Sequence, residues 1–131
     1  MSSSRYSRNA RPRRTLVPEP RRAELWWVDW SPGRGSEQTG LRPALVVQTD
    51  AASGNPHYPN VVVVTVSTRG RPVPFHVVLP PDPATGLERT SFAKCEQIMT
   101  ISKDRLVRRI GQVPPETIEM VTAALRLVLD L

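Results

Sequence analysis

The most informative polar side chain in this sequence is Arg42, which is followed directly by Pro43. A polar run, RGSEQTGL (34–41), ends at this arginine, and an apolar, strand-like run, ALVV (44–47), begins after the proline. The residue before a proline is biased towards extended conformations and proline has a fixed φ, so the backbone that carries Arg42 is stiff. A guanidinium is planar, permanently charged and able to bind phosphate through two hydrogen bonds. The local sequence therefore suits Arg42 to a rigidly held phosphate contact, with an ordinary surface salt bridge as the alternative.

Few other side chains could do acid–base or metal chemistry. His57 lies in a proline-containing loop and His76 in a strand-like run, so a two-histidine acid–base site would require them to converge. The single cysteine, Cys95, excludes an intramolecular disulfide. A zinc site of the usual Cys/His kind would have to recruit carboxylates. We therefore expect a site that uses neither a metal nor a cofactor.

The net charge of +6 comes from the N-terminal segment. Residues 1–22 contain seven arginines and one acidic residue, Glu19. Of the 18 Lys/Arg and 12 Asp/Glu in the chain, eleven of each remain in residues 23–131, which are formally neutral. The segment 1–21 is rich in Ser, Arg and Pro and cannot bury enough apolar surface to offset the entropy of ordering. We predict a flexible arm over 1–21, either a phosphate-binding arm or a solvated extension, and one domain over 22–131.

The sequence has no membrane or export signal that can be recognised. A membrane-spanning helix needs a run of about eighteen or more apolar residues, which the chain lacks. Arginines occur near the N-terminus, but no apolar stretch of a secretory signal follows them. We expect a cytoplasmic protein that does not bind a membrane.

Most of the chain from residue 23 to 113 has the composition of strands separated by turns. AELWWVDW (23–30) alternates in polarity, and we predict that its tryptophans belong to the core and to interfaces. VVVVTVST (61–68) is a nearly continuous β-branched run, typical of a central strand that is covered on both faces. Further strands are predicted at 42–49, 73–79, 91–102 (one strand or two) and 105–113, with loops at 31–41 and 50–60.

The last segment is predicted to be a helix. Pro114, Pro115 and Glu116 are typical of a first helical turn. Many short strands followed by one helix predict a mainly β protein with α (α+β): a small antiparallel barrel or strongly bent sheet with a C-terminal amphipathic helix. The apolar residues that recur at helical spacing are Ile118, Val121, Leu125 and Val128 or Leu129.

Four stretches of the sequence together resemble the MazF/PemK family of toxin–antitoxin endoribonucleases. They are AELWWVDWSPGRGSEQTGLRPALVVQTD, NVVVVTVST, SFAKCEQIMTISKDRLVRRIG and the terminal ALRLVLDL, which cover the chain from about residue 22 to its end. The GSEQTGLRPALVV and EQIMTISKDRLVRRIG blocks are the most specific, because they occur in the family's order around a strand that ends in hydroxyl residues.

The resemblance implies an SH3-like barrel of the MazF/PemK/CcdB type that forms a homodimer. It implies a metal-independent mRNA interferase that cuts single-stranded RNA at a short sequence, in messenger RNA or in tRNA or rRNA. In such enzymes the ribose 2′-hydroxyl attacks the neighbouring phosphate and leaves a 2′,3′-cyclic phosphate and a 5′-hydroxyl end, which inhibits translation and growth. The implied partner is a MazE-like antitoxin that binds through a disordered acidic C-terminal segment and links the toxin indirectly to DNA.

The resemblance also assigns catalytic residues. Arg42 corresponds to the family's catalytic arginine, and we expect it chiefly to bind phosphate, because a guanidinium stays protonated. The family's catalytic threonine falls on Ser67, a departure from the family pattern, with Thr68 as the alternative. Because side chains alternate along a strand, we expect only one of these hydroxyls to face the site and favour Ser67.

Further residues are expected to hold the RNA: loop residues that grip the strand, polar residues that read base edges, a stacking or edge contact, and a phosphate contact. The loop residues are Ser36, Glu37 and Gln38, and the base-reading residues are Glu96 and Gln97. His76 is expected to supply the stacking or edge contact, and Arg69 the phosphate contact. A second basic cluster, Arg105, Arg108 and Arg109, is predicted to form a solvated strand face.

The rival hypothesis is a binding protein without catalysis. The same barrel occurs in toxins that bind DNA gyrase, and an inactive relative would bind only RNA or an antitoxin. The arginine fixed by a proline favours the nuclease, whereas the serine at the threonine position leaves the rival open.

Overall fold

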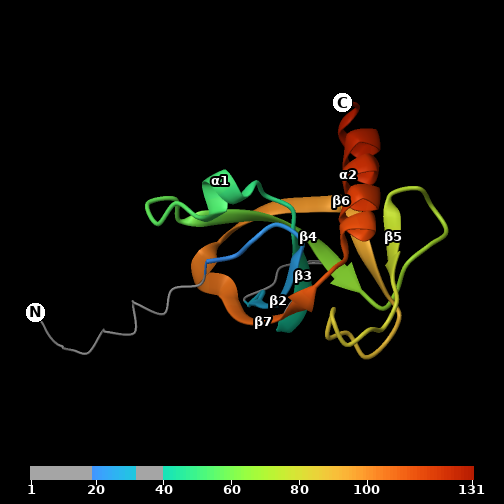
Figure 1. Ribbon diagram of the computed structural model, residues 1–131, viewed down its shortest axis with the longest axis horizontal. Coiled ribbons are helices and arrows are strands. Elements are labelled where there is room, and N and C mark those ends of the chain that lie inside the picture. The colour runs from blue at the N-terminus through green and yellow to red at the C-terminus, as the bar shows by residue number, and fades with distance from the viewer. Residues whose placement is uncertain (1–18, 32–39) are drawn as a thin grey trace, which may run out of the picture.

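The computed structural model describes residues 19–31 and 40–131, which form one curved antiparallel sheet with a helix packed against it (Figure 1). Of the predicted arm over 1–21, residues 1–18 lie outside the described part. No helix of the described residues is long and apolar enough to cross a membrane. The strands are β2 (Glu24–Asp29), β3 (Leu41–Val46), β4 (Asn60–Ser67), β5 (His76–Leu79), β6 (Ser91–Ser102) and β7 (Leu106–Gln112). The helices are α1 (Asp50–Ser53), the 3-10 turn η2 (Lys103–Arg105) and α2 (Pro115–Leu129).

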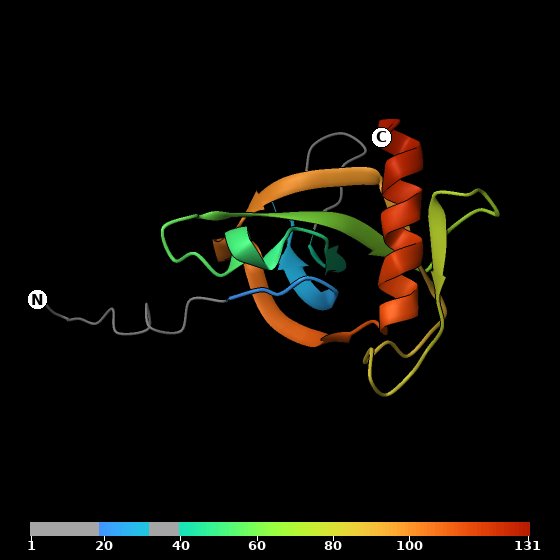
Figure 2. The same cartoon turned by 45° about the horizontal axis from the view of Figure 1, so that its top comes forward.

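The sheet has the strand order β5-β6-β4-β3-β2-β7, so the β-branched strand β4 is central, as its sequence predicts. The mainly β fold with one C-terminal helix is confirmed, but the sheet is not closed, because no ladder joins β5 to β7 in the described residues. The edge of β7 is covered instead by the loop after β5, where the Gln112 N–H donates to the Ala84 carbonyl at 3.0 Å. Figure 2 shows the resulting strong curvature of the sheet beside α2.

Alternate residues of the inner strands pack into two different hydrophobic cores. Leu25 and Val64 belong to the core that α2 covers with Val121. Their chain neighbours Trp26 and Val63 belong to a second core. This is the period-two alternation of strands that are buried on both faces.

Polar contacts tie the start of β2 to the rest of the fold. The Arg22 guanidinium donates to the Thr122 hydroxyl of α2 at 2.6 Å. The buried Glu24 carboxylate accepts from the Trp26 indole N–H at 3.0 Å and from the Arg109 guanidinium at 2.9 Å. Charge-assisted hydrogen bonds of this kind compensate for the burial of a carboxylate, so Glu24 holds β2 against β7.

The segment 50–60, predicted as a loop, begins with the four-residue helix α1. A helix of one turn is too short to leave an apolar period in the sequence. The buried Lys103 ammonium donates to the carbonyl oxygens of Ser53 at 2.9 Å and Asn55 at 3.2 Å. A lysine at the end of a helix satisfies carbonyls that lack partners within the helix, so Lys103 fixes α1 to η2.

Gly111 lies where the loop after β5 rests on β7. A Cβ atom at this position would lie 2.4 Å from the carbonyl oxygens of Ala84 and Thr85. We expect Gly111→Ala to lower the free energy of unfolding by about 1–3 kcal/mol, because loop or strand must move. Denaturant titration measures this, with the exposed Val107→Ala on the same strand as a control that changes stability by less than about 0.5 kcal/mol. An unchanged unfolding midpoint in Gly111→Ala would contradict the contact.

Cys95 is fully buried in β6, and burial raises the pKa of its thiol from the ordinary 9.0 to about 11, with the Glu96 carboxylate acting in the same direction. Only the thiolate is nucleophilic, so at about pH 8 we expect iodoacetamide to leave the folded protein unmodified and to alkylate it in denaturant. The pKa of the Cys95 thiol is higher in the folded protein than in the unfolded chain, so the protonated thiol contributes to the stability of the fold. This contribution is fully present below pH 9.0 and is lost as the pH rises through about 11. Mass spectrometry checks the labelling, and rapid alkylation of the native protein would refute this picture of Cys95.

Candidate active site

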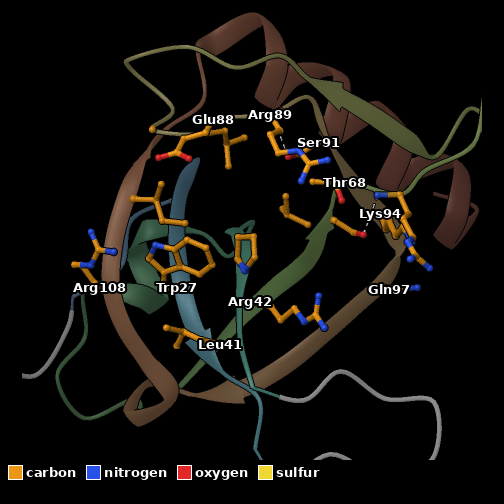
Figure 3. Close-up of a pocket in the computed structure, with 17 residues that line it drawn as sticks. Trp27, Leu41, Arg42, Thr68, Glu88, Arg89, Ser91, Lys94, Gln97 and Arg108 are labelled. Carbon is orange, nitrogen blue, oxygen red and sulfur yellow. Dashed lines mark hydrogen bonds between the residues drawn. The ribbon is translucent and has the colours of Figure 1, made fainter.

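An open groove of about 1010 Å³ crosses the sheet beyond the part that α2 covers (Figure 3). Strands β2, β3 and β7 form one wall, and the end of β4, β6 and the loop before β6 form the other. The lining residues are Trp27, Leu41, Arg42, Pro43, Arg108 and Ile110; Val66, Ser67, Thr68 and Arg69; Lys94 and Gln97; and residues 86–89 and 91.

The groove is strongly basic. Among the described residues that line it, five are Lys or Arg and one, Glu88, is acidic. Neither of the ion pairs found among the described residues uses Arg69, Arg89, Lys94 or Arg108. Uncompensated charges of one sign in a concave surface focus the electrostatic field and attract ions of the opposite sign. The groove is therefore suited to a polyanion.

Two members of the second basic cluster, Arg108 and Arg109, are exposed as predicted, but the three arginines do not share one face. Arg108 lines the groove, Arg109 binds Glu24, and Arg105 donates to the Asp29 carbonyl at 2.8 Å. Arg108 and Arg109 point in different directions because β7 turns alternate side chains to opposite faces and its ladder with β2 is irregular, whereas Arg105 lies in η2, before β7. Of these arginines, only Arg108 contributes to the groove.

Arg42 lies at the loop-to-strand junction that its sequence predicts, and its side chain lines the groove. Its backbone is held by pairing with Val28 of β2 and by the following Pro43. One residue before β3, the Gly40 carbonyl accepts from the Trp30 N–H at 2.9 Å and so closes the base of the preceding loop. The guanidinium is therefore carried by a backbone fixed on both sides.

Both candidate hydroxyl residues line the groove, although alternation predicts only one. The reason is that β4 ends at Ser67, so Thr68 lies beyond the regular strand. The Ser67 hydroxyl oxygen accepts a hydrogen bond from the Arg69 N–H at 3.1 Å. This contact leaves the hydroxyl proton of Ser67 available for donation, and it orients the side chain.

A bulge in β6 places Gln97 at the groove. Thr65 of β4 pairs with Lys94, whereas the residue before it pairs with Ile98, so residues 95–97 have no partner in β4. The buried Thr65 hydroxyl donates to the side-chain carbonyl of Gln97. The amide oxygen of Gln97 is thereby engaged, and its NH₂ group is left to act as a hydrogen-bond donor in the groove.

His76 and Glu96 bind each other and do not line the groove. The ring nitrogen Nε2 of His76 lies 2.9 Å from a carboxylate oxygen of Glu96, and its Nδ1 accepts from the Arg71 N–H at 3.0 Å. Because Nδ1 accepts, Nε2 carries the proton in the neutral ring. The ring also contacts Phe75 edge-on, with centroids 5.4 Å apart. His57 does not line the groove either, so the groove contains no two-histidine site.

The loop residues Ser36, Glu37 and Gln38 lie outside the described residues. Their expected contacts with RNA stay predictions. Within 19–31 and 40–131, no group of three or more His, Cys, Asp and Glu side chains is arranged to hold a metal ion.

Sequence reasoning gave no site role to four aromatic or basic side chains of the groove: Trp27, Arg89, Lys94 and Arg108. Trp26 and Trp30 are buried in the second core, in line with the prediction that the tryptophans belong to the core and to interfaces. Trp27 instead is only half-buried. The signal that could have identified it is its odd position in β2, which turns it to the face opposite its two tryptophan neighbours.

The chain has many relatives along nearly its whole length. It is 40% identical over 115 residues to the endoribonuclease MazF9 of Mycobacterium tuberculosis, which covers 85% of this chain and 97% of the relative. It is 37% identical over 113 residues to the endoribonuclease EndoA of Bacillus subtilis, covering 85% and 95%. The sequence profile of the PemK-like, MazF-like toxins of type II toxin–antitoxin systems matches residues 21–129.

Solved structures are similar in fold. A mycobacterial endoribonuclease in complex with its cognate antitoxin is 29% identical, with a TM-score of 0.69, and covers 86% of this chain and 96% of that one. MazF from Deinococcus radiodurans, at 23% identity, shares the fold with a TM-score of 0.72 over 87% of this chain and 99% of that one. The profile and the relatives agree with the resemblance seen in the sequence. The chain belongs to the family of PemK-like, MazF-like toxins of type II toxin–antitoxin systems.

Proposed function

We propose that this toxin is an endoribonuclease whose groove cleaves single-stranded RNA. Relatives at 37–40% identity over 85% of the chain are named endoribonucleases, which supports the activity. One observation of the structure carries the proposal: Arg42 and the hydroxyl groups of Ser67 and Thr68 line the same groove, together with four further basic side chains. Such a groove attracts the phosphate backbone, and its hydroxyl and guanidinium donors can stabilise a reacting phosphate.

The proposed reaction is an internal transfer within the RNA. The ribose 2′-oxygen attacks the adjacent phosphorus, so a new P–O2′ bond forms and the P–O5′ bond breaks. The 2′-hydroxyl loses a proton and the leaving 5′-oxygen gains one. The products are a 2′,3′-cyclic phosphate and a 5′-hydroxyl end. The reaction consumes no water, and the proposed step does not use a metal ion. Negative charge increases on the non-bridging oxygens in the transition state, where preorganised donors are most effective.

Arg42 and Ser67 supply such donors. The guanidinium of Arg42 binds two phosphate oxygens in a plane. The Ser67 hydroxyl, oriented by the Arg69 N–H at 3.1 Å, donates to a phosphate oxygen. In this proposal Arg42 acts mainly by stabilising charge, and proton transfer is its secondary role.

The proposed partners follow from the same groove and from the relatives. A mycobacterial endoribonuclease of this fold is solved with its cognate antitoxin, which supports an antitoxin partner for this chain. A disordered acidic segment of a MazE-like antitoxin would complement the basic groove and exclude RNA from it. We propose that the toxin acts as a homodimer in the cytoplasm, without a cofactor.

Replacement of Arg42 tests the proposed activity. With EDTA present, the purified protein should cut a long single-stranded RNA at a recurring short motif and leave 5′-hydroxyl ends. Arg42→Ala should slow cleavage by about 10²–10³-fold, the usual cost of losing one donor to a developing oxyanion. Arg42→Lys should recover only part of the rate, because an ammonium cannot bind phosphate through two parallel hydrogen bonds.

Arg126→Ala is the matched control for this experiment, because Arg126 lies on α2 and does not line the groove. It should leave the rate unchanged. Intact RNA after incubation with a wild-type protein that still binds its antitoxin would overturn the nuclease and support the rival hypothesis of a non-catalytic toxin.

The two hydroxyl residues can be separated by mutation. Ser67→Ala should slow cleavage by at least about tenfold, because it removes an oriented donor. Ser67→Thr should retain most activity, and Thr68→Ala should stay within about threefold of the wild type. Single-turnover rates on the mapped motif measure these effects. A larger loss in Thr68→Ala than in Ser67→Ala would transfer the catalytic role to Thr68.

A further inference from the structure

We propose that Trp27 is a stacking platform for a base of the bound RNA, with Arg42 and Arg108 contacting phosphates on either side of that nucleotide. The inference rests on RNA as the ligand of the proposed function. It adds a contact surface for the base beside the phosphate-binding and hydroxyl groups.

The register of the sheet aligns Trp27 with two other groove residues. Trp27 of β2 pairs with Pro43 of β3 and with Arg108 of β7. Side chains that pair directly across antiparallel strands point to the same face, and all three line the groove. Figure 3 shows the indole lying between Arg108 and Arg42. The row of Arg108, Trp27 and Pro43 thus offers an apolar surface with a cation at one end, and Arg42, which precedes Pro43 in the chain, lies on the other side of the indole.

The tryptophans differ in what they contact. Trp26 is 9% exposed and donates its indole N–H to Glu24, and Trp30 is 8% exposed in the second core. Trp27 is half-buried, and among the described residues no aromatic ring packs on its indole and no group accepts from its N–H. Apolar surface that remains in contact with water gains free energy when a ligand covers it. Trp27 therefore favours a ligand with a flat apolar face.

Charge and shape together select a nucleobase of a single strand. Every base has a π face, and in a single strand that face is free to stack on an aromatic side chain. The phosphates on either side of the base meet the guanidinium groups of Arg42 and Arg108. Stacking tolerates any base, so Trp27 contributes affinity, whereas Gln97, held by Thr65, is placed to contribute to base selection.

Tryptophan fluorescence tests the contact without the need for cleavage. The probe is a short single-stranded RNA with 2′-O-methyl groups throughout, which has no 2′-hydroxyl nucleophile and cannot be cut. The wild-type protein should show quenching on binding, because a stacked base contacts an indole. Trp27→Phe should bind with nearly the same affinity but lose most of the quenching, since the remaining Trp26 and Trp30 are buried.

Affinity for the same RNA supplies the second measurement. Trp27→Ala and Trp27→Leu should each weaken binding by about tenfold, the typical cost of removing one stacking side chain. An abasic nucleotide at one position should cost the wild type a similar factor and cost Trp27→Ala almost nothing more. Tyr58→Ala, an exposed aromatic that does not line the groove, should bind as the wild type does. Far-UV circular dichroism establishes that each variant is folded.

The outcomes separate this inference from the proposed function. Cleavage that continues with RNA affinity unchanged in Trp27→Ala and Trp27→Leu would overturn the stacking role alone and leave Trp27 to contact a protein partner. Fluorescence quenching on binding, together with an abasic penalty that is lost in Trp27→Ala, would support stacking. If unmodified RNA is not cleaved in that case, the nuclease is overturned. A wild-type protein that does not bind RNA would overturn both.

Discussion

The bulge in β6 is the feature on which both the core and the groove depend. Residues 95–97 have no partner in β4, whereas the residues on either side of them remain in the ladder. A bulge bends its strand and increases the local twist, so the first part of β6 can pair with β4 and β5 together and still pack under α2. The same three residues turn Cys95 into the core and Gln97 into the groove. Moving the bulge would alter packing and site at once.

The sequence predicts the strands and helices well, because each is determined by residues close together in the chain. It predicts poorly whether the sheet closes into a barrel, because that depends on contacts between distant residues. The β-branched run identifies β4 as central, and Pro114 to Glu116 identify the start of α2. The run 91–102 reads as one strand or two because the bulge interrupts its alternation. The loop after β5 covers the edge of β7 through close contacts at Gly111. A single glycine in a strand does not reveal such contacts in the sequence.

Residues 23–131 are formally neutral, yet the fold places their basic and acidic side chains in different parts of the molecule. Glu24 and Glu96 are engaged by Arg109 and His76, whereas five basic side chains and one acidic side chain of the described residues line the groove. A sum over residues 23–131 cannot show this, because electrostatic potential depends on where charges lie and not on their total. The groove can therefore attract a polyanion without the arginine-rich segment 1–22.

The contrast between Arg42 and Trp27 shows which site residues a sequence can identify. Arg42 is identified because its stiffness comes from the covalent geometry of Pro43, one residue away. Trp27 is not identified from the sequence, because its exposure depends on how far α2 extends over the sheet. Leu25, two residues earlier on the same face of β2, lies in the core that α2 covers, but Trp27 lies beyond it and lines the groove. The site is thus the uncovered end of a core face, where a residue type that normally fills a core becomes available to a ligand.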